Sequence, residues 1–224
     1  MDIALETKDV TKIYRQGGIE VVAVEGVSLS LEAGMVLLIM GPSGSGKTTL
    51  LSMMGCILQP TSGTVRVDKG VVSGLSIDLL PDIRKKYFGF VFQSFNLFPS
   101  LTATENIEVI LRLKGWKKAD MRETAVGLLD AVGLKQRAGF YPRDLSGGEK
   151  QRVAFARAMA GDPAIILADE PTANLDSKTG NSVLELLKDM AETFGKAVAI
   201  VSHDPRAEAL AHRVVFLEDG RLRQ

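Results

Sequence analysis

The chain has 224 residues, 46% of them apolar, which is enough to bury a substantial core within one domain. Its 27 Lys and Arg residues balance its 27 Asp and Glu residues, so no basic excess indicates DNA, RNA or an anionic lipid surface as a partner. Cys56 is the only cysteine, which excludes an internal disulfide framework and a cysteine-rich metal site. We therefore expect no nucleic-acid partner and a cytoplasmic location.

The sequence carries no recognisable targeting or membrane-spanning segment. Residues 1–10 lack the positive and apolar regions of a secretory signal, and no apolar run approaches the roughly 18 to 20 residues needed to cross a bilayer. Any membrane role is therefore expected to come through a partner.

The first part of the chain predicts antiparallel strands. Residues 3–31 contain short alternating or β-branched stretches, broken by the turn signal Gln16-Gly17-Gly18. We expect a small β lobe that covers about residues 1–34 and 61–72.

Apolar runs further along the chain predict buried strands. Residues 35–40 form a continuous apolar run that is followed at once by a glycine-rich loop and a helix-like stretch. Four other runs are mostly separated by helical segments, which predicts an α/β core with a mainly parallel sheet. These runs are residues 87–92, 164–168, 197–202 and 213–217.

A helical lobe is predicted over about residues 95–160. Residues 92–164 contain no convincing strand signal, and helix formers cluster around residues 104–113 and 118–132. We expect this lobe to be an insertion within one domain that spans residues 1–224.

Residues 41–48, GPSGSGKT, predict a phosphate-binding loop, because they satisfy G-x-x-x-x-G-K-[ST] between a strand and a helix. Backbone N–H groups of the loop can surround phosphate oxygens, Lys47 supplies a positive charge, and the Thr48 hydroxyl can ligate Mg²⁺. A flexible Gly/Ser turn is the competing interpretation, and the loop alone would equally suit kinases, GTPases and helicases. The candidate nucleotide-binding residues here are Gly41, Ser43, Gly44, Ser45, Gly46, Lys47, Thr48 and Thr49.

Two adjacent carboxylates follow the strand at residues 164–168. They are expected at the carboxyl edge of a parallel sheet, where such sheets bind ligands. Asp169 would hold Mg²⁺ through water, and Glu170 would polarise or deprotonate an attacking water. An exposed acidic turn is the alternative interpretation.

A second anion site is predicted at Ser146, Gly147 and Gly148. Ser146 and Glu149 have the spacing of a capping box at the start of a helix that ends near Gly161. Capping alone explains this pattern locally, but two glycines at a helix start also expose N–H groups at the positive end of the helix dipole. Two anion sites for one nucleotide suggest a sandwich between two subunits.

These motifs occur in the order of the ATP-binding cassette family, which the chain resembles over essentially its whole length. The shared segments are GPSGSGKTT, Gln93 after YFGFVF, LSGGEKQR, LADEP, Asn174-Leu175-Asp176 and Ser202-His203-Asp204. The resemblance implies a RecA-like P-loop core that hydrolyses ATP with Mg²⁺. It also implies a second cassette subunit, expected as a homodimer with ATP.

The resemblance assigns roles to four further residues. Tyr14 matches the aromatic platform for adenine, with a packed strand tyrosine as its alternative. Gln93 matches the glutamine that reaches Mg²⁺ and the attacking water, and His203 matches the histidine that contacts the γ phosphate. Asp176 resembles the loop that crosses the dimer interface, and an ordinary helix N-cap is a compatible role. The implied catalytic residues are Glu170, His203 and Gln93, and the implied Mg²⁺ ligands are Thr48, Gln93 and Asp169.

An integral-membrane permease is expected to dock near residues 93–101. Residues 94–99 are unusually apolar for a loop, which fits either the core of the helical lobe or a docking surface. In the family this region meets the membrane subunit, which implies a peripheral position on the cytoplasmic face of the inner membrane.

Residues 89–107 and 167–177 look most like the macrolide-exporter, lipoprotein-releasing and heterocyst-exporter branch of the family. The chain end soon after Leu222 is expected to leave no room for the regulatory domain of carbohydrate importers. A cassette that signals to an envelope partner without transport, and a soluble cassette ATPase, are the alternatives.

Overall fold

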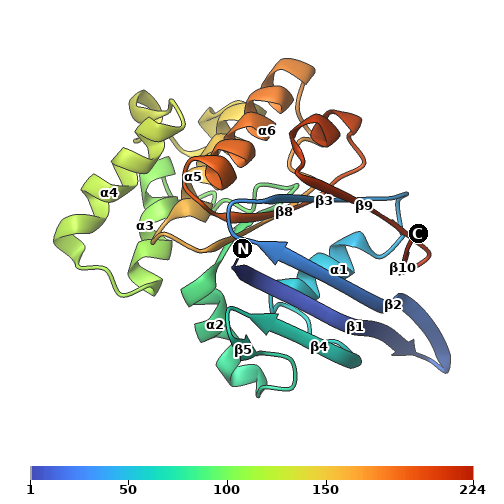
Figure 1. The fold of residues 1–224 in the computed structure, drawn as a ribbon. Coiled ribbons are helices and arrows are strands. Elements are labelled where there is room, and N and C mark those ends of the chain that lie inside the picture. Colours follow the sequence, from blue (N-terminus) through green and yellow to red (C-terminus); the bar gives the residue numbers. More distant parts are fainter. Residues whose placement is uncertain (1, 224) are drawn as a thin grey trace.

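Two β-sheets and a group of helices form residues 2–223, the part of the chain that the computed structural model describes (Figure 1). One sheet has four strands in the order β2-β1-β4-β5, and the other has six in the order β10-β9-β3-β8-β7-β6. The predicted α/β fold with a separate antiparallel sheet is confirmed.

The four-stranded sheet is antiparallel throughout. Its longest strands are joined by a two-residue turn at Gly17 and Gly18, whose φ angles of 58° and 83° suit the turns that match the natural twist of a hairpin. The strands are β1 (Ile3–Gln16), β2 (Ile19–Glu32), β4 (Ser62–Val67) and β5 (Gly70–Val71).

The six-stranded sheet is parallel except for its last strand, which returns antiparallel to β9. Every residue of β3 and β8 is buried, because helices or the other sheet cover both faces, and this explains their continuous apolar runs. The strands are β3 (Val36–Met40), β6 (Phe88–Val91), β7 (Ile165–Asp169), β8 (Ala197–Val201), β9 (Arg213–Glu218) and β10 (Arg221–Leu222).

The helices divide between the two faces of this sheet and the helical lobe. Helix α1 packs between the two sheets, α6 covers the opposite face, and α3, α4 and α5 share a third apolar cluster (Figure 1). The α-helices are α1 (Lys47–Met54), α2 (Leu80–Tyr87), α3 (Ala103–Leu113), α4 (Lys118–Ala131), α5 (Gly147–Met159) and α6 (Ser177–Glu192). Short 3₁₀ helices are η1 (Ile77–Leu79), η2 (Lys135–Arg137), η3 (Pro142–Asp144) and η4 (Pro205–Leu210).

The sequence did not predict α2, and the run at residues 87–92 is shorter as a strand, because α2 continues to Tyr87 before β6 begins. Among the described residues, no helix is both long and apolar enough to span a bilayer.

Candidate nucleotide-binding site

A cavity of about 640 Å³ lies where the carboxyl ends of β3, β6, β7 and β8 face the start of α1. The predicted phosphate loop, Gln93, Glu170 and His203 all contribute to it, although they come from segments far apart in the sequence. The residues that line it are Ala23, Pro42, Ser43, Gly44, Gly46, Lys47, Thr48, Thr49, Gln93, Glu170 and His203.

The phosphate loop is pressed against neighbouring backbone. Gly46 has a φ of 99°, and a Cβ atom there would lie 2.1 Å from the carbonyl oxygen of Ala23. A Cβ atom at Gly41 would lie 2.0 Å from the carbonyl oxygen of Leu217. Glycine is therefore required at both positions to hold the loop between β2 and β9 and leave its backbone N–H groups accessible.

The polar side chains of the loop suit an anion. The Lys47 ammonium is nearly buried and donates hydrogen bonds to the carbonyl oxygens of Gly41 and Pro42, each at 2.8 Å, so its third N–H remains for another acceptor. The buried Ser45 hydroxyl has no hydrogen-bond partner within residues 2–223. Phosphate oxygens would satisfy both groups.

Oxygen ligands for a divalent cation lie beside the loop. The Thr48 hydroxyl donates to Asp169 Oδ1 at 3.1 Å. Burial raises the pKa of Asp169, and the neighbouring negative charge of Glu170 raises it further, which an added cation would counteract. Within residues 2–223 no three His, Cys, Asp or Glu side chains converge to bind a metal. The donor set fits Mg²⁺, which commonly uses one or two protein oxygens together with phosphate oxygens.

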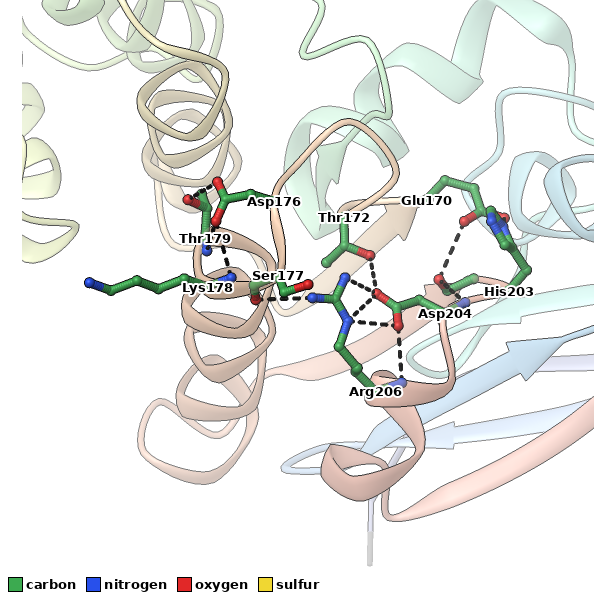
Figure 2. Close-up of polar contacts among 10 residues, drawn as sticks. Glu170, Thr172, Asp176, Ser177, Lys178, Thr179, His203, Asp204 and Arg206 are labelled. Carbon is green, nitrogen blue, oxygen red and sulfur yellow. Dashed lines mark hydrogen bonds and ion pairs between the residues drawn. The ribbon is translucent and has the colours of Figure 1, made fainter.

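Glu170 is held by the loop that follows β8. Its Oε1 accepts a hydrogen bond from His203 Nδ1 at 2.9 Å, and its Oε2 accepts one from the Ser202 hydroxyl at 3.3 Å (Figure 2). Because a carboxylate can only accept, Nδ1 of His203 carries the proton and Nε2 remains free for another partner. Glu170 also has a left-handed φ of 46°, an uncommon geometry that often marks functional sites.

Two predicted parts of the site, Ser146–Gly148 and Asp176, do not line the cavity of this chain. Ser146 begins α5 with the predicted capping box: its hydroxyl accepts from Glu149 N, and the Glu149 carboxylate accepts from Ser146 N. The segment Ser146–Gly148 is nevertheless absent from the cavity wall. Asp176, also absent, caps α6 by accepting from the backbone N–H groups of Lys178 and Thr179.

Tyr14 lies on β1 beside the cavity but outside its wall. It pairs with Val21 of β2, which is two residues along the chain from the cavity residue Ala23. Tyr14 is 43% exposed, so it is not a packed core tyrosine.

Sequence reasoning missed the polar network behind Glu170. Asp204 and Arg206 form an ion pair with N–O contacts down to 2.6 Å, and Asp204 also accepts from the Thr172 hydroxyl at 2.9 Å. The hydrogen bonds from Arg206 lower the pKa of Asp204 to about 2. Asp204 and Arg206 are two residues apart in the sequence, and this spacing was the available signal for their ion pair. The spacing does not identify the contacts that either residue makes with other segments.

Comparison with known proteins gives consistent matches. The family described as "ABC transporter" matches residues 24–173. The uncharacterized ABC transporter ATP-binding protein MJ0796 of Methanocaldococcus jannaschii is 44% identical over 97% of this chain and 94% of its own length. The macrolide export ATP-binding/permease protein MacB of Hyphomonas neptunium is 43% identical over 97% of this chain. The chain spans only 34% of that protein.

Solved structures of the MJ0796 cassette have the same fold. Its dimeric structure aligns with a TM-score of 0.91 at 43% identity, covering 98% of this chain and 97% of the other. A dimeric post-hydrolysis state bound to ADP and Pi aligns with a TM-score of 0.92 over the same fractions.

Proposed function

Because this chain belongs to the ABC transporter family, we propose that it is the ATP-hydrolysing subunit of an exporter or lipoprotein-release type complex. It binds MgATP between two copies and drives a membrane partner. One observation carries this proposal: a single chain gathers the phosphate loop, Gln93, Glu170 and His203 around one cavity but leaves Ser146–Gly148 outside it. A second copy would supply that missing helix N-terminus.

The nucleotide binds first to groups of one copy, and the second copy then closes over it. The phosphates occupy the loop that contains Lys47, and the adenine stacks on Tyr14 beside the aliphatic surface of β2. The N-terminus of the second copy's α5, with its free N–H groups, then faces the γ phosphate. ATP thereby acts as a ligand that selects the closed dimer.

The residues that would hold Mg²⁺ are Thr48, Asp169 and Gln93. When bound there, the cation neutralises charge on the phosphate oxygens. Asp169 contributes through its carboxylate oxygens, which the Thr48 hydroxyl already orients at 3.1 Å.

Hydrolysis requires water to attack the γ phosphorus while the bond to the ADP oxygen breaks. Glu170 accepts a proton from this water, and His203 and Ser202 hold the two oxygens of that carboxylate in place. With its Nδ1 proton engaged by Glu170, His203 presents Nε2 toward the phosphate. Its side chain is 69% exposed, so it can follow the phosphate as the site closes. Release of ADP and phosphate removes the ligand that stabilises the dimer.

The membrane partner docks near residues 93–101. This loop exposes the apolar ring of Phe98, which supports a contact with a partner. Because the loop directly follows the cavity residue Gln93, a partner bound there would respond to the state of the cavity. The MacB relatives are named ATP-binding/permease proteins, and a permease is the class of membrane partner that we propose here. That partner would hold this subunit at the cytoplasmic face of the inner membrane.

The test replaces Glu170 with Gln and measures turnover and mass by light scattering. We expect turnover to fall by about 10²-fold to 10⁴-fold and the variant to form dimers only with MgATP. Glu208→Gln, the same change at an exposed position of η4, is the control and should keep normal turnover. A Glu170→Gln chain that stays monomeric and fully active in saturating MgATP would refute the proposal.

A further inference from the structure

One hydrogen-bonded network joins the catalytic carboxylate to the start of α6 (Figure 2). On the catalytic side, the Ser202 hydroxyl donates to Glu170 and accepts from the backbone N–H of Asp204 at 3.0 Å. The two oxygens of the Asp204 carboxylate then share a bifurcated hydrogen bond from the single N–H of Arg206 Nε, and one of them also accepts from Arg206 Nη2. Arg206 is therefore linked to the groups that hold Glu170.

The same guanidinium also holds the first turn of α6. Arg206 Nη1 donates to the carbonyl oxygen of Ser177 at 3.0 Å. The guanidinium also lies over Gly180, where an added Cβ atom would be 3.0 Å from both Nη1 and Nη2 of Arg206. Ser177 directly follows Asp176, which caps the helix with its own side chain. Glycine at position 180 thus makes room for the arginine against the helix.

We propose that Arg206 is a positioning residue that couples Glu170 and His203 to the Asp176 segment, which rests on the proposed function of a two-copy ATPase. His203 and Arg206 belong to the same short stretch of chain, so a shift of that stretch when the γ phosphate leaves displaces the guanidinium from Ser177. The first turn of α6 then moves with it, together with its N-cap Asp176, which the family resemblance places at the interface between the two copies. In this way hydrolysis in one site is transmitted to the other copy.

Arginine suits this task better than lysine. Its planar guanidinium offers five donors in a fixed geometry, and here Nε and Nη2 engage the carboxylate while Nη1 reaches the α6 carbonyl. A lysine ammonium could reach one of these groups but would not hold both in a fixed relation. The lowered pKa of Asp204 keeps the pair ionised throughout the neutral range.

The experiment compares Arg206→Met, Arg206→Lys and Gly180→Ala. We expect Arg206→Met to lower kcat by at least about fivefold and to reduce the Hill coefficient for ATP, with the MgATP Kd unchanged. Arg206→Lys should restore only part of the loss. The control Arg213→Met removes a guanidinium that meets the Ser30 hydroxyl at 3.4 Å and should leave kcat and cooperativity unchanged.

Gly180→Ala separates coupling from folding. Alanine favours a helix interior more than glycine does, so a purely structural role of Gly180 predicts a chain that is at least as stable and fully active. We instead expect a weakened contact with Arg206, and therefore a lower kcat and Hill coefficient in a chain that is folded by circular dichroism. This variant also keeps the test decisive if Arg206→Met fails to fold.

Normal kcat and cooperativity in Gly180→Ala and in folded Arg206→Met would overturn the inference, as would a loss of MgATP affinity equal to the loss of kcat. The proposed function would survive either result if Glu170→Gln still forms MgATP-dependent dimers. Absence of those dimers would instead refute the proposed function itself.

Discussion

Replacing Gly46 with alanine tests whether close backbone packing shapes the phosphate loop. Gly44 offers a matched control in the same loop, because both glycines have left-handed φ angles, 99° at Gly46 and 82° at Gly44. Only the surroundings differ: a Cβ atom at Gly46 would lie 2.1 Å from the carbonyl oxygen of Ala23, whereas a Cβ atom at Gly44 would have nothing within 4 Å.

The magnitudes follow from these two geometries. A left-handed alanine costs on the order of 1 to 3 kcal/mol, and the smaller entropy of the unfolded chain offsets about 0.4 to 1 kcal/mol of this. We therefore expect Gly44→Ala to lower the free energy of unfolding by about 1 kcal/mol. Gly46→Ala bears the same strain and forces the loop away from β2, so its total loss should reach about 4 kcal/mol.

Urea denaturation without nucleotide measures both losses, because the strain and the overlap exist before any ligand binds. Titration calorimetry with MgATP then shows whether the displaced loop still binds phosphate, and we expect Gly46→Ala to lose binding. Equal losses of unfolding free energy in the two variants would refute the reasoning, since backbone strain alone would then explain both.

Two other variants test charged side chains, the half-buried Asp204 and the buried Arg157. Asp204→Asn should lower the free energy of unfolding at pH 7 by about 2 kcal/mol, because the folded pKa of Asp204 is about 2 and each pKa unit corresponds to about 1.4 kcal/mol. The folded pKa is the lower one, so this stabilisation is present above the unfolded pKa of about 3.9 and lost as the pH falls toward 2. Urea titrations at pH 7 and pH 3 should show the difference between the two chains shrinking, and a constant difference would contradict the assignment. Arg157→Met should alter the free energy of unfolding by less than about 2 kcal/mol, because two effects oppose each other. The loss of its hydrogen bonds destabilises the folded chain, whereas the loss of the buried charge removes the cost of taking that charge out of water. Its guanidinium donates to the carbonyl oxygens of Phe95 and Asn96, so hydrogen exchange at residues 94–99 should become faster, and unchanged exchange would contradict this role.

Local patterns in the sequence were sufficient for much of the fold. The capping box at Ser146 depends on residues three apart, and the structure contains both of its hydrogen bonds. The buried strands were recognisable because helices and sheets cover both faces, which demands continuous apolar runs. Helix α2 was missed because its charged residues and Pro81 gave no clear apolar face, and only Leu80 of this helix is buried.

The parts of the site that could not be predicted depend on contacts between distant segments. The hydrogen bond between His203 and Glu170 joins residues 33 positions apart, and the bonds from Arg157 to the loop after Gln93 span 61 and 62 positions. Sequence patterns place such residues on strands or loops but do not specify which side chains meet. The exposure of Tyr14 also depends on the register of β1 and β2, which the alternation alone did not fix.

The shared site is tested most directly with two variants of the Glu170→Gln chain, one carrying Lys47→Ala and the other Ser146→Arg, labelled with different fluorophores. Neither variant alone can build a complete site, whereas a mixed dimer joins the intact phosphate loop of one chain to the intact Ser146–Gly148 segment of the other. We expect energy transfer between the labels on adding MgATP to the mixture, and no MgATP-dependent dimer of either variant alone. Dimers of the separate variants as tight as the mixed dimer, or no association in the mixture, would contradict a nucleotide held between two copies.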